Sequence, residues 1–159
     1  MTWLLRFAAT GDRDVFKVRH RSREVAQLLG VEERGQVRLA TALSEVGRYL
    51  LRTGRPVAVT FRVTGGAVQV DLDGTGPVPP DLADGIAAAR RLMDSVELTR
   101  APDGFCVVLR RRLPASMPAP DAAAVERIRA VLAAGRPTSV LDEFGVQNSQ
   151  LITALEQAQ

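Results

Sequence analysis

The chain has 159 residues with a hydrophobic fraction of 46% and a charged fraction of 25%, which is ordinary for a globular protein with one core. Apolar runs are too short for a membrane helix and the amino terminus lacks a signal-peptide pattern, so no membrane partner is expected. The net charge of only +3 and the aromatic fraction of 4% argue against a nucleic-acid partner, and the single cysteine excludes an internal disulfide and suits the cytoplasm.

The first part of the chain predicts a strand and two helices. Residues 2–8 have the pattern of a strand, and apolar residues recur near the helical period over 12–30 and 33–54, where Gly30 and Gly54 mark the ends. The residues expected on the buried sides of the helices are Val15, Val18, Val25, Leu28, Leu29, Leu39, Leu43, Val46 and Leu50.

Two strands follow, over 56–63 and 67–73, with a tight turn at Gly65 and Gly66 between them. Apolar side chains alternate along both strands, which predicts a hairpin with one buried face. The residues expected on that face are Val57, Val59, Phe61, Val63, Val68, Val70 and Leu72.

The remaining globular region predicts one more helix and two more strands. The helix is expected to begin near Asp81 or Asp84, and the strands cover 95–100 and 104–113. The fold class is therefore expected to be α+β, a two-layer sandwich with a mixed or antiparallel sheet and helices on one face.

A proline-rich linker at 114–120 is expected to separate this domain, 1–113, from a helical extension at 121–159. Asp121 is the expected N-cap of the first helix in the extension. Further along, apolar residues at alternating spacings of three and four predict the start of a coiled coil, which favours a homodimer. This seam consists of Leu141, Phe144, Asn148, Leu151, Leu155 and Ala158.

Three motifs occur in the order in which a known fold carries them: "RLATALSEVGRYLL" at 38–51, "VDLDGTGPVP" at 70–79 and "GIAAARRLMDSVEL" at 85–98. They resemble the N-box helix, the first glycine box and the end of the second glycine box of the histidine-kinase-like ATPases, most closely the anti-sigma-factor serine kinase branch. The resemblance covers residues 2–113. The resemblance implies the fold of the histidine-kinase-like ATPases and a role in bacterial signal transduction. It also implies a position within a larger protein that carries a kinase or phosphatase module.

The resemblance also implies where the family's chemistry would lie if the chain were active. Glu45 would be the catalytic glutamate that orients or activates a hydroxyl or a water. Asp73, Gly74, Gly76 and Gly85 would then bind ATP. No residue is assigned to a metal.

The family's magnesium ligand is missing from its expected position. An asparagine normally follows the glutamate by four residues, but Tyr49 stands there, and a phenol is a bulky and poor ligand for a hard cation. Without that metal site, Glu45 is expected to form an ion pair with Arg48 or Arg52 on the same helix.

The family's adenine acceptor is also replaced. That carboxylate lies two residues before the first glycine of the box, where this chain has Leu72. Asp71 and Asp73 flank it, but alternation along a strand turns both away from the face that carries Leu72.

The mobile lid of the second glycine box is reduced to the eight residues between Gly76 and Gly85, and prolines stiffen it. Asp81 and Asp84 lie where a helix amino terminus would receive phosphates. Either carboxylate is expected to cap that helix and to repel an anion.

These four departures together indicate a nucleotide-free relative of the ATPases with no cofactor. The sequence predicts a non-catalytic regulatory domain that binds a partner signalling protein, its own dimer mate, or both. Two alternatives stay open: an ATP-dependent anti-sigma-type serine kinase with an atypical pocket, and a small-molecule sensor that uses the emptied pocket.

Overall fold

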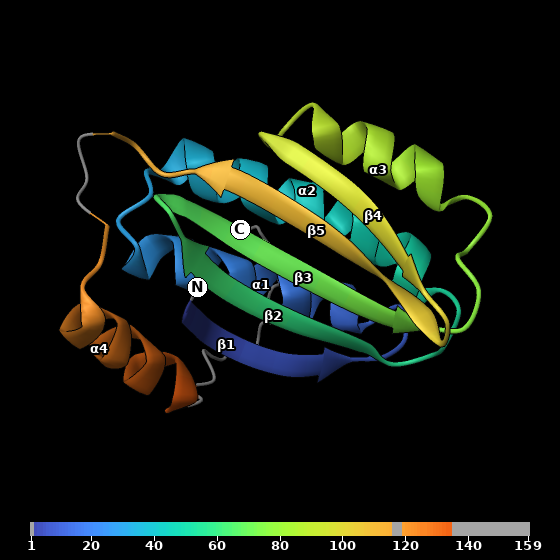
Figure 1. The fold of residues 1–159 in the computed structure, drawn as a ribbon, viewed down its shortest axis with the longest axis horizontal. Helices are drawn as coiled ribbons and strands as arrows, with labels where there is room; N and C mark the ends of the chain where they lie inside the picture. The colour runs from blue at the N-terminus through green and yellow to red at the C-terminus, as the bar shows by residue number, and fades with distance from the viewer. Residues whose placement is uncertain (1, 116–118, 135–159) are drawn as a thin grey trace, which may run out of the picture. The chain divides into compact units, whose positions relative to one another are not determined.

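The computed structural model describes residues 2–115 and 119–134, which contain five strands and four helices (Figure 1). No helix among these residues is both long and apolar enough to span a lipid bilayer. In chain order the elements are β1 (Thr2–Ala9), α1 (Asp14–Leu28), α2 (Glu33–Leu51), β2 (Val57–Thr64), β3 (Ala67–Thr75), α3 (Leu82–Arg90), β4 (Ser95–Ala101), β5 (Gly104–Arg112) and α4 (Ala122–Ala133).

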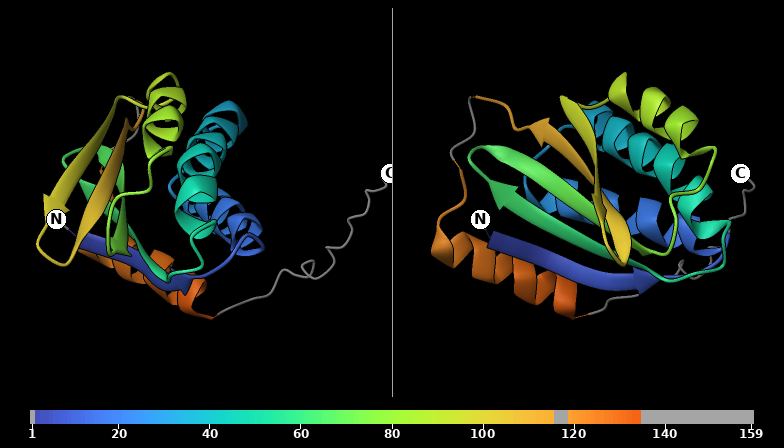
Figure 2. Two further views of the ribbon diagram at one scale, coloured as in Figure 1. Left: turned by 90° about the vertical axis from the view of Figure 1, so that its right-hand side faces the viewer. Right: turned by 45° about the vertical axis from the view of Figure 1, so that its right-hand side comes forward.

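The five strands form one sheet in the order β1-β2-β3-β5-β4, and each neighbouring pair is antiparallel. Helices α1, α2 and α3 cover one face of this sheet, as the turned views in Figure 2 show. Helix α2 packs against both α1 and α3. The predicted α+β two-layer sandwich is confirmed, and its sheet is antiparallel throughout.

The β2–β3 hairpin turns where the sequence predicts. Gly65 and Gly66 have φ angles of 52° and 81°, in the left-handed region that glycine adopts without a steric penalty. The register places Phe61 opposite Val70, so the apolar residues of both strands share one face.

The core lies between the sheet and the three helices. The seven apolar residues predicted for the inward face of the hairpin are at most 8% exposed, and the predicted stripe of α2 is at most 2% exposed. The prediction for α1 is wrong at Leu28, which is 37% exposed. Successive helical residues differ by about 100° in direction, so Leu28 and Leu29 cannot both face the core, and Leu29 is the buried one.

Helix α4 begins where the sequence predicts a helix. The Asp121 carboxylate accepts a hydrogen bond of 2.8 Å from the Ala124 amide, which is the geometry of the predicted N-cap. The coiled-coil seam at 141–158 lies outside the described residues. The domain boundaries at 113 and 121 therefore remain predictions.

Candidate functional site

The residues that the family resemblance assigns to a nucleotide site lie at one end of the sheet. There the loop after β3 leads into α3, and α2 ends beside it (Figure 1). The structure brings Glu45 together with Gly85 between α2 and α3, and Gly74 together with Gly76 at the end of β3. Asp73 is exposed on the other face of the sheet, so the five residues do not form one site.

Gly85 is a point of close contact between α3 and α2. A β-carbon added to Gly85 would lie 2.5 Å from the backbone oxygen of Glu45 and 2.7 Å from Cδ2 of Tyr49. Contacts that short are repulsive, so only glycine lets the two helices approach this far. Gly85 is an interior residue of α3 and not part of a lid loop.

The side chains on this part of α2 are engaged with one another. The guanidinium groups of Arg48 and Arg52 lie 5.3 and 5.0 Å from the centre of the Tyr49 ring, within the range of cation–π attraction. Arg48 also lies 3.7 Å from the Glu45 carboxylate, which is one of the two ion pairs expected from the sequence. A hydrogen bond to Tyr49 and the charge of Glu45 raise the pKa of Arg48.

Leu72 belongs to the hydrophobic core. It is 2% exposed and lies opposite Val59 on one side and Val107 on the other. An aliphatic side chain offers no acceptor for the amino group of adenine. The position that carries the family's carboxylate therefore contributes packing.

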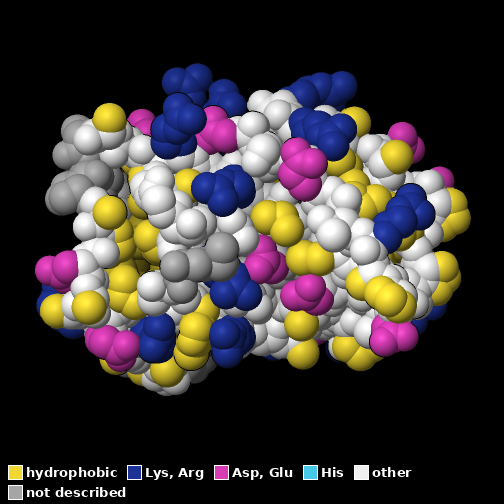
Figure 3. Space-filling model, in the orientation of Figure 1, with side chains coloured by type: hydrophobic (Ala, Val, Ile, Leu, Met, Phe, Trp, Pro, Cys, Tyr) yellow, Lys and Arg dark blue, Asp and Glu magenta, His cyan; other side chains and the backbone are white. Residues whose placement is uncertain are grey.

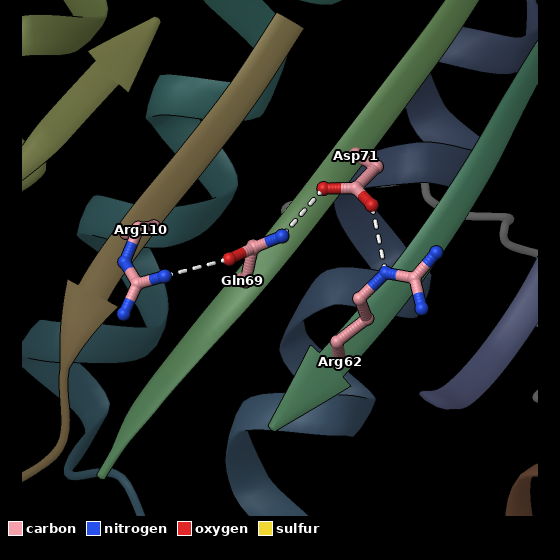
Figure 4. Close-up of polar contacts among 4 residues, drawn as sticks. All are labelled: Arg62, Gln69, Asp71 and Arg110. Carbon is pink, nitrogen blue, oxygen red and sulfur yellow. Dashed lines mark hydrogen bonds and ion pairs between the residues drawn. The ribbon is translucent and has the colours of Figure 1, made fainter. Parts of the chain in front are cut away.

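The carboxylate of Asp71 lies on the face of the sheet opposite to α1, α2 and α3 (Figure 4). It accepts hydrogen bonds from Arg62 at 2.7 Å and from Gln69 at 2.9 Å, and Gln69 in turn accepts one from Arg110 at 2.8 Å. This chain of four side chains crosses β2, β3 and β5. Asp71 is 8% exposed, and these partners satisfy its buried charge.

Asp73 lies on the same face of the sheet, opposite Cys106 of β5. Burial and a hydrogen bond to Asp73 raise the pKa of the Cys106 thiol to about 12. A thiol with so high a pKa is almost wholly protonated near neutral pH and is a poor nucleophile.

The two glycines of the first box serve the local packing. A β-carbon at Gly74 would lie 2.5 Å from the ring of Phe105, which is stacked against it from β5. Gly76 has a φ of 75°, and its amide donates a hydrogen bond of 3.2 Å to the backbone oxygen of Asp103 in the β4–β5 turn. The amide that a phosphate loop would offer to a ligand is therefore already bonded.

The space between α2 and this glycine turn is nearly filled. The cavity there has a volume of about 10 Å³, which is room for roughly one water, whereas pockets for drug-sized ligands measure about 300–1,000 Å³. Its lining consists of Leu50, Thr53, Arg55, Pro56, Val57, Gly74, Thr75, Pro79 and Phe105.

Helix α3 begins at Leu82 without the predicted carboxylate cap. Asp81 occupies the N-cap position, but its φ and ψ of −91° and 4° lie outside the extended region, and its side chain makes no capping bond. The Leu82 and Asp84 amides bond instead to the backbone oxygens of Pro79 and Asp81, at 3.1 Å each. The prediction that Asp81 or Asp84 caps α3 is wrong, although both are exposed and bring negative charge to its first turn.

The residues at this end of the domain do not fit magnesium and ATP. Tyr49 packs on α3 in place of a metal-ligating amide, and Leu72 replaces the adenine acceptor. Within the described ranges, no three His, Cys, Asp or Glu side chains are grouped so that they could hold a metal ion.

One solved structure supports the fold assignment. The crystal structure of the RsbU and RsbW domains of Rv1364c from Mycobacterium tuberculosis is similar with a TM-score of 0.56 and 20% sequence identity, over 72% of this chain and 34% of that chain. The chain thus spans about a third of the solved chain. No protein-family model and no curated protein matches it. At 20% identity the likeness shows a shared fold.

Sequence reasoning missed the contacts that close this region. The ring of Phe105 lies on Gly74, although 31 positions of chain separate them, and Gly85 meets Tyr49 from another helix. The glycines themselves were visible in the sequence, but a glycine that permits a close contact has the same letter as one that binds phosphate. The sequence alone does not show which aromatic side chain contacts each glycine.

Proposed function

We propose that this domain is a non-catalytic regulatory module of bacterial signal transduction that binds protein and not nucleotide. The observation that carries the proposal is the direct packing of α3 on α2, where the backbone of Gly85 meets the Glu45 carbonyl and the Tyr49 ring. In the resembled ATPases, magnesium and the phosphates would occupy the space between these two segments.

The filled cavity supports the same proposal. With about 10 Å³ between α2 and the glycine turn, an adenine ring could enter only if Phe105 and the proline loop moved together. Such a movement would open the core next to Leu72, at a cost in buried apolar area. The small volume disfavours a sensor that binds its ligand between α2 and the glycine turn, because that space would have to remain open.

A protein partner is the role that we favour for this domain. The solved neighbour is described by its RsbU and RsbW domains, and this module is proposed to take part in a comparable signalling assembly. The partner is proposed to be another signalling protein, a second copy of this chain through its carboxyl-terminal extension, or both.

Thermal melts with and without Mg-ATP test the proposal against the kinase alternative. A ligand at a hundred times its Kd stabilises the folded state by about 2.7 kcal/mol, which would raise Tm by several degrees. We expect no change in Tm with Mg-ATP, Mg-ADP or ATP and EDTA. A rise that requires magnesium would favour the kinase, above all if label from γ-labelled ATP then appeared on a serine of an added protein.

A further inference from the structure

A cluster of arginines lies at the opposite end of α2. Arg111 of β5 donates a hydrogen bond of 3.0 Å to the backbone oxygen of Leu92, just after α3. Its guanidinium also borders α2, since a β-carbon added to Gly35 would lie 3.5 Å from Nη2 of Arg111. Arg111 therefore lies between the start of α2 and the end of α3, and both contacts hold it in place.

Three further arginines project from the same two helix ends. Arg34 and Arg38 lie in the first turns of α2, and Arg91 is the C-cap of α3. The two helices pack against each other and run in opposite directions, so the start of one lies near the end of the other (Figure 1). The arginine patch is defined as Arg34, Arg38, Arg91 and Arg111. Figure 3 shows basic side chains along the upper edge, with acidic side chains among them.

Four arginines elsewhere on the molecule have a carboxylate partner, and the members of the arginine patch have none within the described part of the chain. Ion pairs join Arg21 to Glu24, Arg23 to Glu33, Arg48 to Glu45 and Arg62 to Asp71. Among the described residues, no ion pair reaches any member of the patch.

Three carboxylates lie close to the patch along the chain, and none of them forms an ion pair with it in the described ranges. Glu33 pairs with Arg23, Asp94 accepts a bond from the Arg112 amide, and Glu32 forms no ion pair within the described part of the chain. Neighbouring positive charges repel one another, and a bound anion would remove that repulsion.

We propose that the arginine patch binds an acidic segment of a partner protein, which deepens the proposed function and rests on it. Guanidinium groups pair with carboxylates through two parallel hydrogen bonds, and arginine is enriched in the residues that dominate protein interfaces. Val37, which is 45% exposed on the same part of α2, adds an apolar contact. A nucleic acid is a poorer match, because the chain has a net charge of only +3 and 4% aromatic residues.

The test uses a fluorescein-labelled peptide of Glu, Asp and Ser and measures fluorescence anisotropy with the full chain. The patch variant R34Q/R38Q/R91Q leaves Arg111 in place because that side chain braces two helices. The control R13Q/R19Q/R100Q removes the same charge from exposed arginines elsewhere. We expect the patch variant to bind the peptide at least roughly tenfold more weakly and the control to change Kd less than about threefold.

Equal losses in both variants would mean that net charge alone attracts the peptide, and would overturn the proposal. So would an absence of binding to the wild-type chain, or tighter binding of single-stranded DNA of similar length. The Tm of the patch variant should equal or exceed that of the wild type, because repulsion is relieved; a clear fall would make the patch structural and also overturn the proposal. None of these outcomes bears on ATP binding, so the proposed function is tested separately.

Discussion

At Gly85 the lack of a side chain sets the distance between α2 and α3. Gly85→Ala forces a β-carbon against the Glu45 carbonyl and the Tyr49 ring, so we expect it to destabilise the protein by about 1–3 kcal/mol. Gly47→Ala is the matched control, because Gly47 lies within α2 and a β-carbon there meets nothing within 4 Å. It should be neutral or stabilising by up to about 1 kcal/mol. Urea unfolding of both variants measures the difference, and equal stabilities would show that the helices are not in close contact.

Leu72 tests whether the adenine-acceptor position is part of the core. Leu72→Asp buries an unpaired carboxylate, so we expect a loss of about 3 kcal/mol or more. Thermal melts with and without ATP provide the measurement. If an ATP site survived here, the same substitution would be tolerated and would improve nucleotide binding.

Cys106 gives a prediction for the face of the sheet opposite to α1, α2 and α3. Its thiol has a pKa of about 12, so at pH 8 it should react with iodoacetamide roughly a thousandfold more slowly than a free cysteine of pKa about 8.5. Because the folded state holds this proton more tightly than the unfolded state, the associated stability is present below pH 8.5 and is lost as pH rises toward 12. Asp73→Asn should speed the reaction, and a rate that levels off near pH 9 in the wild type would contradict the assignment.

The extension beyond the globular domain is predicted to dimerise the protein. Apolar residues in a heptad pattern at 141–158 would form an exposed stripe in a monomer, and Asn148 at an a position favours a two-stranded parallel pair. In sedimentation, we expect the full chain to be a dimer and a chain ending at Pro120 to be a monomer. Two monomers would mean that the extension does not dimerise the protein, and two dimers would assign the interface to the globular domain.

At this scale the sequence predicts strands better than helix ends. Alternation assigns the inward-facing residues of β2 and β3 correctly, because a strand leaves a residue only two directions. The expected single buried face is wrong for β3, where Ala67, Gln69 and Asp71 on the opposite face are also buried. The helix predictions fail at two places. Helical periodicity is wrong at Leu28, and at the start of α3 the backbone oxygens of Pro79 and Asp81 replace the expected aspartate cap. Such local hydrogen bonds depend on the dihedral angles of a few residues and leave no periodic pattern to find.

For the molecule as a whole, the sequence shows which of the family's residues are replaced, and it does not show the contacts that the replacing residues make. From their chemistry alone, the phenol of Tyr49 is a poor ligand for magnesium, and the aliphatic side chain of Leu72 offers no acceptor to adenine. The packing of Phe105 on Gly74 joins distant segments, so it required the folded chain. The arginine patch is similar, since its members come from three elements and meet only when α2 and α3 pack.

Isothermal titration calorimetry with Mg-ATP tests the central claim most directly. The claim is that α3 packed on α2 leaves no nucleotide site in this domain. The full chain, titrated at concentrations where a micromolar Kd would give a clear isotherm, should release no heat beyond that of dilution. A magnesium-dependent isotherm with micromolar Kd would contradict the account, because it would mean that the contact of Gly85 with Tyr49 opens to admit ATP.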